Sequence, residues 1–385
     1  MKKAGIAFFL KVVLPLWYRI ACLFEKKQAS VLFLEIRYRE ITDNLRLLQK
    51  ACEKQEGMRS EVFFLQTGEG SMASYLRRCL SMVRYLARAK VVFVDESSDV
   101  LAAIPIRKET SVVQCWHACG AFKRFGHGIG KLEREYYGPY AFVTVSSPTM
   151  VPFYADAMNQ PAEKILPLGI SRTDRFFDEA FCRDSREKVE KMIPETKGKK
   201  VILLAPTFRG NVANAKMPPL PDLSYMKEAL GDWCVMLFKG HPAFPEKIRV
   251  PEDAADFCFD VSGRLSIEEL MPAADYCITD YSSLIFEFAL FDRPILFFAP
   301  DLSDYDDKRG FYHSIQDLDA GEIYRDTKEL TEGLVSELSC NEQGMREESA
   351  KRLSAFREKF MQSCDGHATE RIMERAGLFA KSSKG

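Results

Sequence analysis

Short apolar runs alternate with amphipathic stretches along the first half of the chain. The apolar runs are bounded by polar residues, and the stretches near 43–55 and 75–88 have the spacing of helices. Buried strands that alternate with helices are typical of a parallel sheet covered on both faces. The strands that this pattern predicts are Val31–Ile36, Glu61–Gln66, Lys90–Asp95, Ser111–Trp116 and Ala141–Ser146.

The same alternation restarts after the polar stretch 183–199. We therefore expect a domain boundary near Asp178 and two Rossmann-like, doubly wound α/β domains, 29–178 and 179–385, facing a central cleft at the carboxyl ends of their strands. A charged helical pattern from 328 to 376 predicts a C-terminal cover that packs back across both domains. The strands predicted here are Lys200–Pro206, Cys234–Gly240, Asp275–Asp280 and Pro294–Pro300.

The N-terminal segment Gly5–Phe24 is apolar but contains Pro15 and the cations Lys11 and Arg19. A secretory signal would need a small-residue cleavage site, and none is evident. A spanning helix would have to bury both cations, whereas an interfacial helix lets them reach anionic headgroups. We expect residues 1–28 to form an amphipathic helix on the cytoplasmic face of the membrane. A core helix of the first domain and a true span are the alternatives.

The charge balance and the cysteine content argue against several classes of function. Lys plus Arg number 54 against 55 Asp plus Glu, so no strongly basic field favours nucleic-acid binding. The 11 cysteines include no CxxC pair and fit reduced thiols in a cytosol. Cys115, His117 and Cys119 lie close together, but no second ligand pair with metal spacing follows, so we expect no metal site and no cofactor.

The strongest candidate site follows the predicted strand 275–280. Ser282 and Ser283 open a helix there, whose N–H groups and dipole favour an anion such as phosphate. Glu287, one turn further, places a carboxylate where ribose hydroxyls could donate to it. An ordinary N-cap without a ligand and a solvated helix residue are the alternatives.

Two histidines stand at predicted strand ends. His241, in the sequence FKGHP, lies beside Lys239 and Gly240, where it could donate to a phosphate or protonate a leaving group. His117 ends another strand, where it could act as a base for an acceptor hydroxyl. His127 lies in a loop rather than at a strand end, so we favour His117. A structural role is the alternative for each histidine.

Two further loops at strand ends carry arginines. The sequence APTFRG offers Thr207 and Arg209, and LGISRTDRF offers Arg172 and Arg175. A guanidinium group can bind phosphate through two hydrogen bonds, although a surface ion pair is the commoner role of a single arginine. Five such loops spread over both halves favour one shared phosphate-bearing ligand.

These segments together resemble the CDP-glycerol glycerophosphotransferases of teichoic-acid and related polymer synthesis. The resemblance runs in order from Val31 to Tyr312, and the long final segment is the most specific part. Members commonly read WHGTP, RxHP and GYPRND where this chain has WHACG, KGHP and GISRTD; these departures bear on the polyol and the acceptor. The segments are WHACGAFK, GISRTD, APTFRGN, KGHP and TDYSSLIFEFALFDRPILFFAPDLSDYDDKRGFY.

The resemblance implies an α/β fold of GT-B type with a CDP-activated donor in the cleft. It places the general base on His117 and a second essential histidine, near the donor phosphates, on His241. It assigns the pyrophosphate to Ser282 and Ser283 and the ribose side to Glu287. The other donor contacts that it implies are Ala118, Cys119, Gly120, Ala121, Arg172, Pro206, Thr207, Lys239 and Gly240, to which the sequence adds Arg209.

The function expected from these residues is the transfer of glycerol phosphate or ribitol phosphate from CDP-glycerol or CDP-ribitol. The acceptor would be a hydroxyl of a lipid-linked wall or capsule polymer at the inner leaflet, and CMP would be released. A GT-B glycosyltransferase that uses a nucleotide-sugar and a non-catalytic assembly subunit are the alternatives.

Overall fold

The computed structural model describes residues 3–379, except 27, 29, 133, 211–213, 242–247, 304, 306–309 and 341–344. The chain forms two compact units. Unit 1 comprises Met1–Asp174 together with Gln362–Gly385, and unit 2 comprises Arg175–Met361. The division falls between Asp174 and Arg175.

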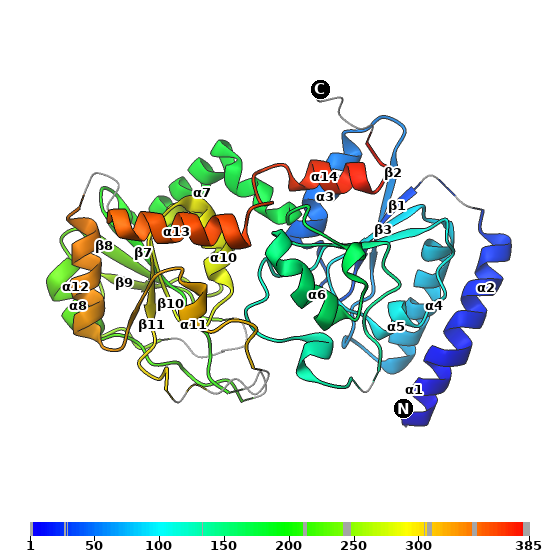
Figure 1. Ribbon diagram of the computed structural model, residues 1–385, viewed down its shortest axis with the longest axis horizontal. Coiled ribbons are helices and arrows are strands. Elements are labelled where there is room, and N and C mark those ends of the chain that lie inside the picture. Colours follow the sequence, from blue (N-terminus) through cyan, green and yellow to red (C-terminus); the bar gives the residue numbers. More distant parts are fainter. Residues whose placement is uncertain are drawn as a thin grey trace. The chain divides into compact units, whose positions relative to one another are not determined.

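Unit 1 is built on a six-stranded sheet in which all pairs are parallel, with the order β2-β1-β3-β4-β5-β6 (Figure 1). The central strands are buried along almost their whole length, which explains their continuous apolar sequence. The strands are β1 (Ser30–Glu35), β2 (Arg59–Phe64), β3 (Val91–Val94), β4 (Ser111–Gln114), β5 (Phe142–Thr144) and β6 (Ile165–Leu166).

Helices cover both faces of this sheet. Val31 and Phe33 pack with α3 and α14 in one core, and the alternating Leu32 and Leu34 are buried toward the opposite face, where α4 contacts β1. The side chain of Ser71 accepts a hydrogen bond from the backbone of α4 and so fixes its start. The helices are α3 (Asp43–Glu53), α4 (Met72–Arg88), α5 (Asp99–Ala102), α6 (Val151–Met158) and α14 (Ala368–Arg375).

Unit 2 contains a second six-stranded parallel sheet, ordered β12-β11-β10-β7-β8-β9. One face packs against α8 and α12 in an apolar core. The strands are β7 (Lys200–Leu204), β8 (Cys234–Phe238), β9 (Cys258–Asp260), β10 (Tyr276–Thr279), β11 (Ile295–Phe298) and β12 (Glu322–Tyr324). The helices are α7 (Glu179–Met192), α8 (Leu223–Leu230), α9 (Ile267–Ala273), α10 (Leu284–Phe288), α11 (Ile315–Leu318), α12 (Thr327–Leu338) and α13 (Glu347–Phe360).

The C-terminal cover differs from the expected domain range 179–385, because its last part belongs to unit 1. The carboxylate of Asp174 accepts hydrogen bonds from the backbone N–H groups of Ala368 and Thr369, at 2.9 and 2.6 Å. Ile372 and Met373 are fully buried in the core of unit 1. The segment expected as a C-terminal cover is thus divided, with α12 and α13 in unit 2 and α14 in unit 1.

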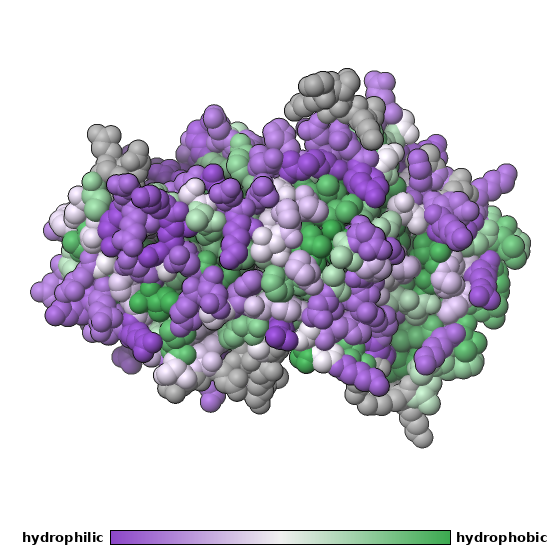
Figure 2. Space-filling view, in the orientation of Figure 1, coloured by the Kyte–Doolittle hydropathy of each residue, from purple (hydrophilic) through white to green (hydrophobic). Residues whose placement is uncertain are grey.

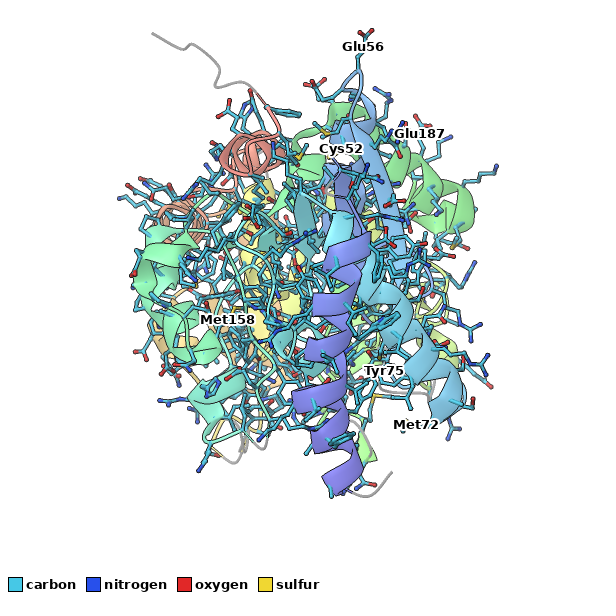
Figure 3. The ribbon with its side chains drawn as sticks, turned by 90° about the vertical axis from the view of Figure 1, so that its right-hand side faces the viewer. Cys52, Glu56, Met72, Tyr75, Met158 and Glu187 are labelled. Carbon is cyan, nitrogen blue, oxygen red and sulfur yellow. The ribbon has the colours of Figure 1, made fainter. Side chains whose placement is uncertain are left out.

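The N-terminal segment is one continuous helix in unit 1. It comprises α1 (Lys3–Phe8), a π-helical turn (Phe9–Val13) and α2 (Leu14–Phe24). The wider turn precedes Pro15, which has no N–H to donate to the preceding turn. Figure 3 shows this helix lying lengthwise beside α4, near Tyr75.

One stripe of the N-terminal helix is buried and the opposite side is apolar but exposed. The buried stripe includes Leu14 and Tyr18, and the indole N–H of Trp17 donates to Leu80 O on α4 at 2.9 Å. Figure 2 shows apolar surface over this part of the molecule. The exposed apolar side chains are Phe8, Val12, Leu16, Leu23 and Phe24, and the cations Lys11 and Arg19 are exposed among them.

Candidate active site

The residues singled out in the sequence lie at the carboxyl ends of parallel strands in both units. In unit 1, β4 leads to His117 and β6 leads to Arg172. In unit 2 the adjacent strands β10, β7 and β8 lead to Ser282, Thr207 and His241. Parallel strands end at the same sheet edge, so each unit gathers its candidate residues on one edge. Four of the five loops follow strands that the sequence predicted, and the fifth, which carries Arg172, follows the short strand β6, which it did not.

His117 is partly exposed, and its ring is fixed from one side. Its Nδ1 atom lies 3.1 Å from the backbone oxygen of Asp95 and 3.5 Å from Oε1 of Glu96. Burial lowers the pKa of His117, and the nearby Glu96 carboxylate opposes this shift, while Arg172 adds to it. The ring is therefore held neutral more easily than in water, which suits a base.

The residue before His117 has an unusual backbone conformation. Trp116 has a φ of 50°, which a bulky side chain rarely adopts and which indicates a functional constraint. The side-chain amide of Asn44, on α3, donates to Trp116 O and accepts from the backbone N–H of Arg172 at 3.2 Å. The hydroxyl of Ser171 donates to Asn44 O at 2.8 Å. Asn44 thus connects the loop of His117 to the loop of Arg172.

Asn44 was not identified from the sequence, although a signal exists. Asn44, Leu48 and Cys52 lie at helical spacing on the buried face of α3, and the asparagine is the polar member of that face. A buried amide on an apolar face requires polar partners nearby. The sequence does not say which loops supply them.

Two further carboxylates lie beneath His117 and were also missed. Glu35 ends β1, Asp95 follows β3, and both side chains are almost completely buried. Burial, then the neighbouring Glu35, raises the pKa of Asp95 to about 7. The hydroxyl of Thr42 donates to Asp95 Oδ2, and Oδ1 has no hydrogen-bond partner among the described residues. The sequence does contain a signal for these two residues, because each is an acidic residue at or near the end of an apolar run that predicts a buried strand.

The turn Ala118–Ala121 is anchored by its carbonyl groups. The Tyr154 hydroxyl donates to Ala118 O, and the Ser146 hydroxyl donates to Cys119 O, both at 2.7 Å. Gly120 is buried with Cys119 and Ala121. This turn is a rigid backbone surface beside His117.

The geometry of unit 1 bears on two alternatives from the sequence, a metal site at Cys115, His117 and Cys119, and His127 as the base. Cys115 packs in the core cluster of the sheet rather than beside Cys119 and His117 at a surface site. Within the described part of the chain, no group of three or more His, Cys, Asp or Glu side chains could hold a metal ion. Nε2 of His127 lies 3.1 Å from Oε2 of Glu135, so this ring nitrogen already has a hydrogen-bonding partner.

In unit 2, Asp280 joins two of the candidate loops. Its Oδ1 accepts from the backbone N–H of Thr207 at 2.7 Å and from the Thr207 hydroxyl at 2.8 Å. Pro206, just before, is buried. The carboxylate is almost completely buried, so it fixes the loop after β7 relative to the loop after β10.

Arg209 is committed to carboxylates rather than open to a ligand phosphate. Its Nε and Nη2 donate to the two oxygens of Asp301 at 2.6 and 3.1 Å, and Nη1 donates to Asp280 at 2.8 Å. Burial lowers the pKa of Arg209, but these two carboxylates outweigh it and raise the pKa. The guanidinium also lies against the stacked rings of Tyr281 and Tyr305. The geometry therefore favours a structural role for Arg209 over the expected phosphate contact.

The loop after β8 holds Lys239, Gly240 and His241 in different environments. Lys239 Nζ donates to Leu265 O at 2.6 Å, and burial lowers its pKa. The backbone N–H of Gly240 donates to the Ser262 hydroxyl at 2.8 Å. His241 is exposed, and its ring meets Phe208 edge-on at 4.8 Å between centroids. Pro242 lies outside the described residues.

The helix after Ser283 is shorter than the sequence indicated. It spans only Leu284–Phe288 and continues as a 3-10 turn, Ala289–Phe291. Ser283 precedes it without a side-chain capping bond, and Ser282 Oγ accepts from the backbone N–H of Leu284 at 3.2 Å. Glu287 is buried, so it is not the solvated helix residue that was the alternative. Residues 304 and 306–309 of the long final segment lie outside the described residues.

Two α/β units, each with a parallel sheet and with its candidate residues at the carboxyl edge of that sheet, have the organisation of the GT-B fold class. A solved structure of the wall teichoic acid polymerase TagF has this fold. It matches with a TM-score of 0.74 and 20% identity, over 97% of this chain and 95% of that one. The GT-B fold expected from the sequence is confirmed.

Sequence similarity shows which family the chain belongs to. The profile of the CDP-glycerol:poly(glycerophosphate) glycerophosphotransferases matches residues 16–376. The teichoic acid ribitol-phosphate primase of Bacillus spizizenii is 33% identical over 381 residues, which cover 94% of each chain. The teichoic acid glycerol-phosphate primase of Bacillus subtilis is 26% identical over 305 residues, 76% of this chain and 75% of that one. The chain belongs to the CDP-glycerol:poly(glycerophosphate) glycerophosphotransferase family and is a polyol-phosphate transferase, as the resemblance implied.

Proposed function

We propose that this enzyme transfers ribitol phosphate from CDP-ribitol to a hydroxyl of a lipid-linked teichoic-acid acceptor, with His117 as the general base. The observation that carries the proposal is the geometry at Nδ1 of His117. A backbone oxygen can only accept, so Asp95 O, 3.1 Å away, requires a proton on Nδ1. The lone pair is then on Nε2, at the other side of the ring.

The reaction needs a base of this kind because a hydroxyl is a weak nucleophile at neutral pH. The acceptor proton moves to Nε2 of His117, the acceptor oxygen forms a bond to the β-phosphorus, and the bond from that phosphorus to the bridging oxygen breaks. CMP leaves with the electron pair. The lowered pKa of His117 keeps the ring neutral at the start of the reaction.

Donor binding is proposed for the loops of unit 2 and for two segments of unit 1. The backbone and hydroxyls of Ser282 and Ser283 and the exposed ring of His241 would hold the phosphates, since donors aimed at developing charge stabilise the transition state. Thr207 and Gly240 lie in the loops after the neighbouring strands β7 and β8, where Asp280 and Ser262 fix their backbone N–H groups. The proposed contacts are Ala118, Cys119, Gly120, Ala121, Arg172, Pro206, Thr207, Lys239, Gly240, His241, Ser282, Ser283 and Glu287.

Similarity supports ribitol as the polyol. Identity to the ribitol-phosphate primase of B. spizizenii is 33% and extends over 94% of both chains, against 26% for the glycerol-phosphate primase of B. subtilis. The poly(ribitol-phosphate) polymerase of B. spizizenii, 32% identical over 366 residues, supports the same polyol.

We test the reaction by CMP release with membrane-derived lipid acceptor. CDP-ribitol, CDP-glycerol and UDP-sugars are supplied in parallel to wild type and His117→Ala. Release of CMP from CDP-ribitol, lost in His117→Ala while CDP-ribitol still binds by calorimetry, is the expected result. CMP from CDP-glycerol alone would refute the choice of polyol, and release of UDP would replace the function with that of a glycosyltransferase.

Membrane docking is proposed for the N-terminal helix, lying flat on an anionic leaflet. The helix Ala4–Phe24 is long and apolar enough to cross a membrane by length and composition. Crossing would break the packing of Leu14 and Tyr18 on the folded unit. Leu23 and Phe24 are both 81% exposed, and Lys11 and Arg19 on the open side fit anionic headgroups.

Vesicle sedimentation tests this surface with the full-length protein. Phe8→Gln with Leu16→Gln and Leu23→Gln removes exposed apolar groups and leaves the buried stripe intact. We expect binding to vesicles that contain phosphatidylglycerol to fall at least about tenfold, because each buried apolar side chain contributes about 1.5–3 kcal/mol. Trp233→Gln, at a 54% exposed site of unit 2, is the matched control. Unchanged binding of the triple variant would assign docking to another surface.

A further inference from the structure

A buried carboxylate accompanies His117 and is not among the residues expected from the sequence. Glu96 follows β3, which neighbours β4 in the sheet, so both residues lie at the same carboxyl edge. Its side chain is only 7% exposed, and Oε1 lies 3.5 Å from Nδ1 of His117. Its backbone oxygen accepts from the side-chain amide of Gln114 at 3.2 Å, which fixes the loop.

The imidazole nitrogen that faces Glu96 is the one that carries the proton in the neutral ring. Asp95 O and Glu96 Oε1 both lie beside Nδ1 of His117, and both are acceptors. When Nε2 takes a second proton, the positive charge of the ring is shared with Nδ1, directly beside the Glu96 carboxylate. A charge pair in a shielded site stabilises the imidazolium more than water would.

We propose that Glu96 is the positioning residue of a His–Glu pair, which orients His117 and stabilises its imidazolium while the acceptor hydroxyl loses its proton. This inference rests on the proposed base role of His117. Glu96 does not itself take the proton. The proton stays on the ring until CMP has left and then passes to solvent.

The charged groups around His117 and Glu96 determine in which direction the pKa of His117 should change when one of them is removed. Arg37 Nε lies 3.7 Å from Glu96 Oε2, and the Arg37 side chain is 62% exposed. Arg172 and Arg37 both lower the pKa of His117, after burial, and Glu96 raises it. The other ionisable groups that interact with the Glu96 charge are Glu35, Tyr38, Asp95 and Tyr137.

Opposite changes at Glu96 and Arg37 should therefore move the pKa of His117 in opposite directions. Glu96→Gln keeps the shape and removes the negative charge, so the pKa falls and the imidazolium loses support. Arg37→Gln removes a cation that lies on the far side of Glu96, so the pKa rises slightly. If Glu96 only supported the fold, Glu96→Gln would lower stability, but the two variants would not shift the pKa of His117 in opposite directions.

The first experiment measures kcat/KM for CMP release from CDP-ribitol across pH, with membrane-derived lipid acceptor. Glu96→Gln should lower the plateau at least about tenfold, a part of the roughly 10²–10⁴-fold that general base catalysis supplies, and should shift the acid limb to lower pH. Arg37→Gln should shift the limb to higher pH with the plateau nearly unchanged. Adding Glu96→Gln to His117→Ala should cost nothing further. An unmoved acid limb, or additive losses, would overturn the proposal.

The second experiment does not depend on turnover, so it separates failure of this inference from failure of the proposed function. Selective labelling of the five histidines with ¹⁵N allows NMR titration of each ring, and His117→Gln assigns the signal. The neutral ring of His117 should carry its proton on Nδ1, and Glu96→Gln should lower its pKa. A protonated Nε2 in the neutral ring, or an unchanged pKa in Glu96→Gln, would refute the pair even if CDP-ribitol is not the donor.

Discussion

Asn44 is the side chain on which the geometry around His117 most depends. It is 1% exposed on α3, and its amide connects Trp116 O to the backbone N–H of Arg172. Asn44→Ala removes both side-chain hydrogen bonds and leaves these two backbone groups without their partner. The bond from Ser171 to Asn44 O survives, because it involves only the backbone of residue 44.

The expected loss of stability follows from these two bonds. Each hydrogen bond contributes about 1 kcal/mol net, and a buried group left unsatisfied costs about 1–3 kcal/mol. A total of about 2–3 kcal/mol is therefore expected for the opening of unit 1. At about 1.4 kcal/mol per factor of ten, the open state becomes roughly 30- to 150-fold more populated. Trp116, with its positive φ, should also relax, so turnover should fall together with stability.

Cysteine labelling measures this change within each unit of the intact protein. Cys115 and Cys119 are buried in unit 1, and Cys277 is buried in unit 2. A thiol reagent followed by peptide mass spectrometry gives the labelling rate at each cysteine. We expect Cys115 and Cys119 to label roughly 30- to 150-fold faster in Asn44→Ala, with Cys277 unchanged.

The control for this experiment is Lys50→Ala, an exposed position on the same helix. It should leave all the rates within about twofold of wild type, since exposed substitutions change stability by about 0.5 kcal/mol or less. If labelling of Cys115 and Cys119 in Asn44→Ala rises no more than in the control, the amide does not hold these loops, and the reasoning is refuted.

Three further predictions concern the carboxylates and the serines. Asp95 has a folded pKa of about 7 against an ordinary value of 3.8, so the native state binds the extra proton and loses stability as pH rises from about 4 to about 7. Asp95→Asn removes this loss, so the free energy of unfolding of the variant, measured in urea, should rise relative to that of wild type by at most about 3 kcal/mol between pH 5 and pH 8. If the difference between variant and wild type is the same at both pH values, the raised pKa of Asp95 is contradicted. Arg209→Ala leaves Asp280 and Asp301 unpaired and should destabilise unit 2 by about 3 kcal/mol, seen as faster labelling of Cys277; an unchanged rate would show that the cluster is not structural. Ser282→Ala with Ser283→Ala should raise KM for the CDP-polyol about tenfold with kcat little changed, measured by CMP release, and an unchanged KM would remove both hydroxyls from the donor site.

Much of the fold could be predicted because its strands are buried on both faces. The run Val31–Ile36 is apolar except for Glu35, and the structure places β1 at Ser30–Glu35. Strands β6, β9 and β12 were missed because they contain only two or three residues and show no periodicity. The charged pattern from 328 to 376 reads as one helical cover, although three separate helices form it.

The candidate site was predictable in position but not in its connections. The sequence shows that His117 follows a strand, because QCWHACG ends an apolar run. It does not show that Asn44, distant in sequence, reaches the adjacent Trp116, because this depends on how α3 packs. The sequence context of Arg209 fits a phosphate ligand, but it does not show that Asp280 and Asp301 accept hydrogen bonds from the guanidinium group.

The return of the chain to unit 1 after residue 361 has a consequence for biosynthesis. The core of unit 1 includes Ile372 and Met373, and Asp174 holds the start of α14. The ribosome therefore synthesises all of unit 2 before it releases the last piece of unit 1. Unit 2, a continuous segment, can complete its sheet during translation, while the core that α3 shares with α14 in unit 1 stays incomplete until α14 is made. A truncation that removes α14 would consequently damage the half of the enzyme that was translated first.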